Sequence, residues 1–170
     1  MQDKAQLIIE QIPKLRRYAR ALTGDAALAD DLVQDSLERA WSRFHLWRPG
    51  SNMRAWMFTI MHNCYANTVR RAKYRPRVVP LEEWGSDAQI GPAQEKATEL
   101  RQVGEALRQL PEEQRAVVLL VGLEEHTYAK AAKILGIPLG TVMSRLSRGR
   151  ERLRNLVSNP SSYAVERSSE

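Results

Sequence analysis

Residues 127–154 constrain the fold of this chain more than any other stretch, and they read TYAKAAKILGIPLGTVMSRLSRGRERLR. The hydroxyl of Thr127 can accept a backbone hydrogen bond at the start of a helix. Gly136 can end that helix in the left-handed conformation, which costs glycine little, and Pro138 can begin another helix. The stretch therefore predicts two helices joined by a tight turn, a helix-turn-helix whose second helix enters the DNA major groove.

Apolar residues recur every three or four positions in both of these helices, so each has one face suited to burial. On the first helix they are Tyr128, Ala131, Ala132 and Leu135, and on the second they are Val142, Leu146 and Leu153. The opposite face of the second helix carries Thr141, Ser144, Arg145 and Arg148. An ordinary helical hairpin with a solvated basic face is the alternative. The glycine turn, the small alanine pair and the arginines together favour nucleic-acid binding.

Charge is distributed in blocks along the 170 residues, whose formal net charge is +6. Residues 51–80 contain six Lys and Arg and no Asp or Glu, and residues 127–154 contain seven against one Glu. Between these blocks, residues 81–99 contain five acidic residues and one Lys. This pattern favours two surfaces that face phosphates, joined by a segment that avoids DNA.

Helical periodicity also predicts helices over residues 5–22, 26–44, 53–73, 99–110 and 112–123. Pro13 either kinks the first of these or marks its true start. In the helix at 99–110, the residues expected inside are Leu100, Val103, Leu107 and Leu110. The periodicity disappears over 78–98, where glycines and prolines predict a flexible linker. We therefore expect an all-α fold with two small helical domains, at 1–77 and 99–157, and a frayed tail at 158–170.

The sequence lacks the usual signs of catalysis, metal binding and secretion. It has no P-loop, no GxSxG motif and only three scattered histidines, so we expect no enzyme activity, no cofactor, no metal and no small-molecule substrate. The single Cys64 cannot form an internal disulfide, which fits a reducing compartment. No apolar run approaches membrane-spanning length and no signal-peptide core is present, so we expect a cytoplasmic chain without membrane insertion.

Two other helices carry patterns that leave alternatives open. In the helix at 26–44, Asp31, Asp35 and Glu38 form an acidic stripe, which is either a solvated face or a dock for a basic partner. In the helix at 53–73, aromatic residues precede a basic end, a combination suited to single-stranded nucleic acid. The alternative is that these aromatic residues are core, and we expect Trp56 to be at least partly so.

Four segments in order resemble the extracytoplasmic-function (ECF) sigma factors, the minimal promoter-recognition subunits of bacterial RNA polymerase. Residues 30–41 (DDLVQDSLERAW) resemble the polymerase-clamp segment, and residues 55–63 (AWMFTIMHN) resemble the promoter-melting helix. Residues 110–115 (LPEEQR) resemble the opening of the fourth conserved region, and residues 135–146 (LGIPLGTVMSRL) resemble its helix-turn-helix.

The resemblance implies three binding surfaces. The polymerase-binding surface consists of Asp31, Gln34, Asp35, Glu38 and Trp41. The minus-ten surface, which captures an unpaired base and holds the strand, consists of Trp56, Asn63, Asn67, Arg70, Arg71 and Lys73. The minus-thirty-five surface consists of Thr141, Met143, Ser144, Arg145 and Arg148. The implied partners are core RNA polymerase, promoter DNA and an anti-sigma factor.

The chain departs from the family pattern at Met143, where many members carry Arg or Lys, so no promoter sequence is carried over. The loop at 47–50 also differs from the usual Phe-Arg-Gly form. Two other functions fit parts of the sequence. One is a sigma-mimic adaptor that binds a sigma regulator without binding DNA, although such a protein need not keep both basic blocks. The other is a stand-alone helix-turn-helix regulator, which leaves the first domain unexplained.

Overall fold

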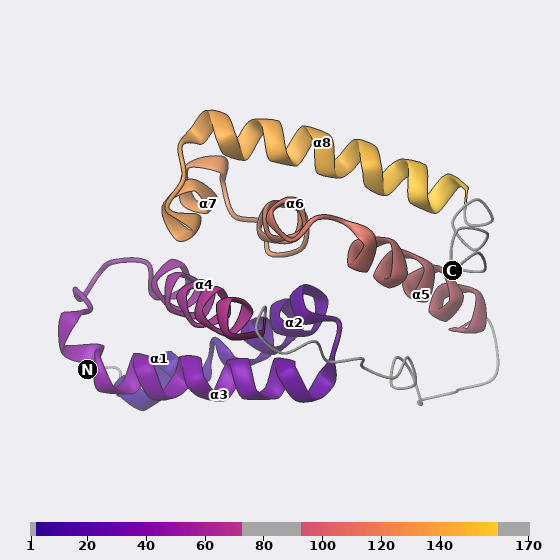
Figure 1. Cartoon of the computed structure of the whole chain (residues 1–170). Coiled ribbons are helices and arrows are strands. Elements are labelled where there is room, and N and C mark those ends of the chain that lie inside the picture. The colour runs from indigo at the N-terminus through magenta and orange to yellow at the C-terminus, as the bar shows by residue number, and fades with distance from the viewer. Residues whose placement is uncertain (1–2, 73–92, 160–170) are drawn as a thin grey trace.

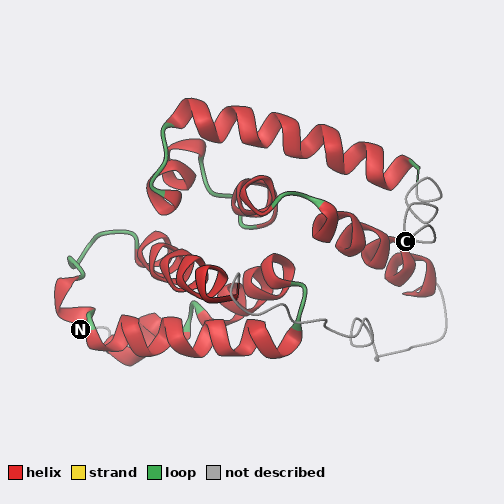
Figure 2. Ribbon diagram, in the orientation of Figure 1, coloured by secondary structure: helices red, strands yellow, loops and turns green. Residues whose placement is uncertain are grey.

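The computed structural model describes residues 3–72 and 93–159, and every regular element in those ranges is a helix (Figures 1 and 2). The first half contains α1 (Lys4–Ile9), α2 (Ile12–Thr23), α3 (Ala26–Ser42), the short 3-10 turn η1 (Phe44–Leu46) and α4 (Met53–Ala72). The second half contains α5 (Ala93–Gln109), α6 (Glu112–Val118), the π-helical turn η2 (Leu119–Leu123), α7 (Tyr128–Leu135) and α8 (Leu139–Ser158).

The first half is a helical bundle in which α3 packs against both α2 and α4. Its centre is Tyr18 of α2, which is fully buried and meets the ring of Phe58 edge-on, with ring centroids 5.1 Å apart. Asp25 starts α3 because its side chain accepts a hydrogen bond from the backbone N–H of Leu28 at 2.9 Å. Gly24, with φ of +67°, ends α2 in the left-handed region just before this cap.

The single helix predicted over residues 5–22 is instead two helices. The helix is interrupted between Ile9 and Ile12, and Pro13 lies in the first turn of α2. This proline therefore marks a helix start rather than a kink. The reason is local: proline has no N–H to donate, and the first turn of a helix is where that loss is harmless.

In the second half, α8 crosses α6 at a position without a side chain. A Cβ atom on Gly149 would come within 2.7 Å of the Val118 side chain, so glycine allows this close approach. The helix predicted over 112–123 is α-helical only as far as Val118 and continues as the π turn η2. Residues 116–120 are buried, as expected of core.

The prediction for the helix at 99–110 was wrong in two respects. The helix α5 begins at Ala93, so the last six residues assigned to the linker are helical. Leu100 and Val103, which we expected inside, are 70% and 37% exposed, whereas Ala106 and Leu110 are buried. Burial is confined to the C-terminal part of α5, where Arg108 also reaches Gly24 in the first half.

The two halves lie against each other, with α4 beside α7 and α2 beside α6 and η2 (Figure 1). The predicted linker residues 78–92 and tail residues 160–170 lie outside the described residues. The domain boundaries at 77 and 99 remain predictions. Among the described helices, none has the length and apolar character needed to span a membrane.

Candidate functional site

The turn at Gly136 has the predicted helix-turn-helix geometry. The Thr127 hydroxyl accepts a hydrogen bond from the backbone N–H of Lys130 at 3.2 Å and caps α7. Gly136 has φ of +64° and ends α7, after which Pro138 immediately precedes α8. Within α7, Ala131 is buried as predicted, but Tyr128 is 39% exposed and Ile134 is buried in addition. The buried face of α7 is therefore rotated slightly from the predicted apolar face, away from Tyr128 and toward Ile134.

One face of α8 is buried and the other is open to solvent. Val142 and Leu146 are buried, and they anchor the helix against the second half. The residues of the predicted minus-thirty-five surface are exposed or half-buried: Thr141, Met143, Ser144, Arg145 and Arg148. The Met143 side chain is 51% exposed, and Arg145 lies 3.5 Å from a carboxylate oxygen of Glu113. The helix therefore presents cationic and small polar side chains on one continuous face, as major-groove reading requires.

The predicted polymerase-binding surface is a continuous exposed stripe on α3. All five of its residues are exposed, namely Asp31, Gln34, Asp35, Glu38 and Trp41. The Gln34 amide donates to the Glu38 carboxylate at 3.4 Å, along the same face. Trp41 is 55% exposed at the end of this stripe.

Lys4 of α1 extends this surface in a way that sequence periodicity did not predict. Its ammonium group lies 4.7 Å from the ring centroids of both Trp41 and Phe44. A cation held over two aromatic faces is attracted by their quadrupoles and restrains the rings. Lys4 therefore holds Trp41 in place at the end of the acidic stripe.

The predicted minus-ten surface lies on α4. Asn63 and Asn67 are exposed one turn apart, Arg71 is exposed near the end of the helix, and Trp56 is half-buried against Phe44. Tyr65 and Met61, on the same helix, are buried and therefore belong to the core. The side chain of Arg70 and all of Lys73 lie outside the part of the chain that the structure describes.

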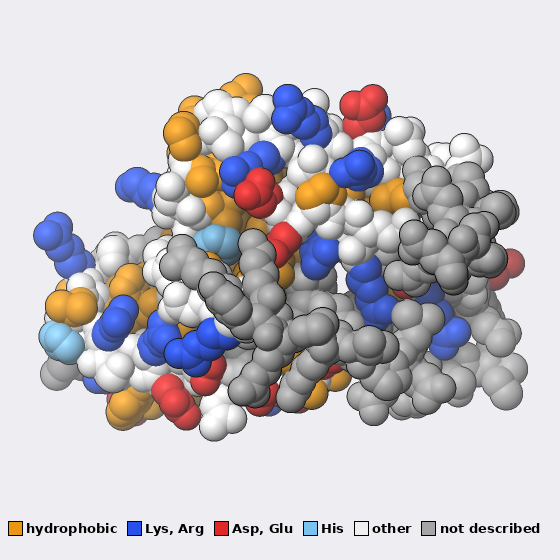
Figure 3. Space-filling view, viewed as in Figure 1, with side chains coloured by type: hydrophobic (Ala, Val, Ile, Leu, Met, Phe, Trp, Pro, Cys, Tyr) orange, Lys and Arg blue, Asp and Glu red, His pale blue; other side chains and the backbone are white. Residues whose placement is uncertain are grey.

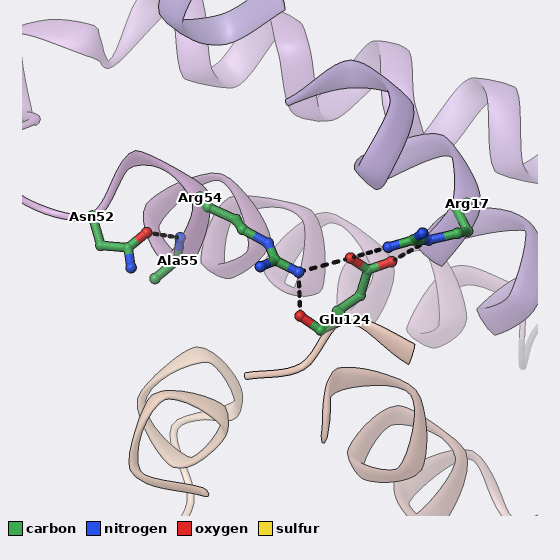
Figure 4. A network of polar contacts seen from close by, with 5 residues as sticks. All are labelled: Arg17, Asn52, Arg54, Ala55 and Glu124. Carbon is green, nitrogen blue, oxygen red and sulfur yellow. Dashed lines mark hydrogen bonds and ion pairs between the residues drawn. The ribbon is translucent and has the colours of Figure 1, made fainter. Parts of the chain in front are cut away.

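Three charged side chains meet where the two halves touch, and sequence analysis did not single out any of them (Figure 4). Glu124 follows η2 in the second half, and its side chain is fully buried. Arg17 of α2 donates two hydrogen bonds to the Glu124 carboxylate, at 3.0 and 3.1 Å. Arg54 of α4 donates to a carboxylate oxygen of Glu124 at 3.0 Å and also to its backbone carbonyl. Glu124 holds the pKa of Arg17 above its usual value.

Arg54 reaches Glu124 from the first turn of α4, and the start of that helix is capped. The Asn52 side chain accepts a hydrogen bond from the backbone N–H of Ala55 at 3.0 Å (Figure 4). This cap holds the first turn of α4, so Arg54 projects from an ordered element. No local sequence pattern predicts this meeting, because Glu124 is 107 residues from Arg17 and 70 residues from Arg54.

His126 lies beside this network and is buried at the same contact. Its ring meets that of Phe58 edge-on, with centroids 5.0 Å apart. Burial, assisted by the positive charge of Arg54, lowers the pKa of His126 to about 4. Burial also lowers the pKa of His62 in α4. The contact between the two halves, which buries His126, therefore favours its neutral form.

Basic side chains lie on both halves of the face shown in Figure 3. Within residues 3–72 and 93–159, no three His, Cys, Asp or Glu side chains gather as metal ligands would. Cys64 is buried. The exposed features of the described chain are an acidic stripe on α3, a polar face on α4 and a basic face on α8.

The class of protein is given by comparison with known families. Residues 8–62 match the family model "Sigma2 domain of PhyR", and residues 100–153 match the model "Sigma-70, region 4". The described architecture is thus that of a sigma factor, with the acidic stripe in the first match and the helix-turn-helix in the second.

Individual relatives place the chain more closely. It is 37% identical to the ECF RNA polymerase sigma factor EcfG of Rhodopseudomonas palustris over 154 residues, covering 88% of this chain and 82% of the relative. It is 39% identical to the ECF RNA polymerase sigma factor SigL of Mycobacterium tuberculosis, covering 81% and 78%. The chain belongs to the ECF RNA polymerase sigma factors.

A solved structure is similar over both halves. The sigma factor RpoE of Bartonella quintana, crystallised with the anti-sigma factor NepR, has a TM-score of 0.77 and 33% identity. The match covers 93% of this chain and 98% of the other. The structure of CnrH with the cytosolic domain of CnrY, at 24% identity and a TM-score of 0.68, supports the fold alone.

The lowered pKa of His126 predicts that stability depends on pH. In the unfolded chain His126 has its ordinary pKa near 6.5, so between pH 6.5 and about 4 the unfolded chain binds a proton that the folded chain does not. The free energy of unfolding should be fully retained above pH 6.5 and should fall as the pH is lowered, by up to about 2 kcal/mol at pH 5. Urea unfolding at a series of pH values measures this decrease.

The variant His126→Gln should reduce the pH dependence of the free energy of unfolding to a smaller remainder, to which His62 contributes. The control His45→Gln replaces an exposed histidine on η1. A wild-type pH dependence in His126→Gln would contradict the assignment of the decrease to His126.

Proposed function

We propose that this ECF sigma factor binds core RNA polymerase through the exposed stripe on α3. The observation that carries the proposal is the exposure of Asp31, Gln34, Asp35, Glu38 and Trp41 along one helical face. Three carboxylates on a rigid helix attract a basic partner surface, and Trp41 supplies an aromatic anchor of the kind that dominates interface energies. The first half, at residues 1–77, is the polymerase-binding and minus-ten domain in this proposal.

The same proposal assigns promoter reading to α4 and α8. Asn63 and Asn67 lie one turn apart on the exposed face of α4, and each amide can pair with the edge of an unstacked base. Arg71, with Arg70 and Lys73, holds the strand through its phosphates. The exposed face of α8 reads the minus-thirty-five duplex through Ser144, Arg145 and Arg148, and Met143 contacts apolar groups such as a thymine methyl.

Control by an anti-sigma factor is part of the proposal. Its support is the likeness, over 93% of this chain, to a sigma factor crystallised with the anti-sigma factor NepR. The protein makes no covalent chemistry in this account and needs no cofactor or small-molecule substrate. It acts in the cytoplasm, where the polymerase acts.

Reversing charge on the acidic stripe should separate polymerase binding from DNA binding. Asp35→Lys and Glu38→Lys place cations against a basic partner, so the affinity for core polymerase should fall by about tenfold or more. Duplex binding by α8 should not change. Glu10→Lys, an identical charge change at the exposed end of α1, is the control. Affinity measured by fluorescence anisotropy decides: equal binding by Glu38→Lys and Glu10→Lys would refute the surface.

Removing one cation from α8 should weaken duplex binding. Arg148→Ala should lower the affinity for a minus-thirty-five duplex, selected from a random pool by the protein itself, by about tenfold. If Arg148 contacts a phosphate, its loss should also reduce the magnitude of the slope of log K against log[salt] by about 0.9. Arg154→Ala, almost two turns further along α8, is the matched control. A gel shift at two salt concentrations reports both effects.

The same gel shift separates the proposal from the adaptor alternative. A sigma mimic that never contacts DNA would show no selected duplex and no effect of Arg148→Ala. A stand-alone helix-turn-helix regulator would bind the duplex but would show no affinity for core polymerase.

A further inference from the structure

Two large apolar side chains lie exposed at the start of α8, the second helix of the helix-turn-helix. Leu139 is the first residue of α8 and is 48% exposed, and Met143 is 51% exposed. They are four residues apart, so they are neighbours on one side of the helix. Hydrophobic side chains are visible at the surface over the start of α8 in Figure 3. We call Leu139 and Met143 the apolar pair.

The packing of α8 explains why the apolar pair is exposed. The buried face of this helix is filled by Val142 and Leu146, and the close crossing with α6 at Gly149 lies on the same face. Successive residues of a helix are about 100° apart around its axis, so Met143 is turned away from the buried Val142 by that angle. The exposure of the pair therefore follows from a helix whose orientation is fixed by its core.

The surroundings of the apolar pair favour DNA as its occupant over a protein. Ser144 and Arg148 are exposed on the adjoining part of α8, so the pair is continuous with a polar and cationic face. A Cβ atom on Gly140 would meet no other atom within 4 Å, so a base edge can approach the helix backbone beside the pair. In a helix-turn-helix, the N-terminal residues of the second helix are those that contact base edges in the major groove.

The chemistry of the apolar pair limits what it can recognise on a base. Leucine has no hydrogen-bonding group and the methionine thioether is only a weak acceptor, so the pair cannot read the pattern of donors and acceptors in the groove. The apolar group that bases present there is the C5-methyl group of thymine. Uracil and cytosine carry hydrogen at C5, whereas 5-methylcytosine carries the same methyl group as thymine.

We propose that Leu139 and Met143 together bind the C5-methyl group of a pyrimidine in the major groove and make duplex affinity depend on that methyl group. The inference rests on the proposed function, because it requires α8 to lie in the groove. Burying one methyl group against the pair should increase the affinity about fourfold. The flexible side chain of Met143 can adjust to either of two adjacent base pairs. The chain therefore responds to cytosine methylation as well as to base sequence.

The proposal is tested by removing single methyl groups from the duplex that the full chain selects from a random pool. Each thymine is replaced in turn by deoxyuridine, which removes the methyl group and leaves the hydrogen bonds of the base pair intact. Fluorescence anisotropy should show about fourfold weaker binding at one or two adjacent positions and no change elsewhere. When cytosine is placed at such a position, 5-methylcytosine should bind about fourfold more tightly than the unmodified base.

Variants of the protein assign the effect to the apolar pair. The double variant Leu139→Ala, Met143→Ala should bind the thymine and deoxyuridine duplexes equally, because the surface that buries the methyl group is gone. Leu100→Ala makes the same change at a position of α5 that is 70% exposed, and it should retain the fourfold difference. Circular dichroism verifies helicity, and the comparison of the two duplexes with the unmodified chain needs no variant to fold.

Three results would overturn the proposal: a selected duplex without thymine, deoxyuridine tolerated at every position, or a deoxyuridine effect of full size in the double variant. Tolerated deoxyuridine is also the result expected if the pair binds a protein instead of DNA. Failure of the proposed function gives a different result. A chain that selects no duplex lacks minus-thirty-five reading altogether, whereas a chain that selects a duplex and ignores deoxyuridine retains that function without methyl recognition.

Discussion

The buried carboxylate of Glu124 is the interaction on which the arrangement of the two halves depends. An isolated charge cannot remain buried, so the carboxylate must have cationic partners wherever it lies. Both cations come from the first half, on α2 and α4, and thereby join two segments that are far apart in sequence. Glu124 directly follows the π turn η2 and precedes Glu125, whose φ is +56°.

The three predicted binding surfaces are each built on a helix whose opposite face is buried. On α8, Val142 and Leu146 are buried on one side while Met143 and Arg148 are exposed on the other. On α3, Leu32 and Val33 anchor the helix below the acidic stripe. Rigid backing of this kind fixes the spacing of the exposed side chains, which is what recognition of a partner requires.

Much of the fold and of the candidate surfaces could be predicted from sequence, for identifiable physical reasons. The cap at Thr127 and the left-handed Gly136 are local features, so their residue types were sufficient to predict the turn. On α3, helical spacing alone predicted the carboxylates Asp31, Asp35 and Glu38, and the family resemblance added Gln34 and Trp41. The exposure of Leu100 and Val103 could not be predicted in this way, because apolar periodicity does not reveal how far a partner helix extends.

The contacts between the halves were missed for a related reason. Arg17 and Arg54 look like ordinary surface cations in a basic protein, and Glu124 looks like part of a solvated turn. Only the tertiary structure brings a nitrogen of each arginine to 3.0 Å from the Glu124 carboxylate. The π turn could not be predicted either, because the residues of η2 continue the apolar pattern of α6 without interruption.

Transcription by purified core polymerase tests whether this chain directs initiation at a promoter. A template carries a minus-thirty-five duplex selected by the protein and a randomised region downstream of it, and transcripts are sequenced with and without the chain. We expect transcripts that start at defined positions, that require the chain, and that disappear with Glu38→Lys or Arg148→Ala. Initiation that is independent of the chain, or equally efficient with both variants, would contradict it.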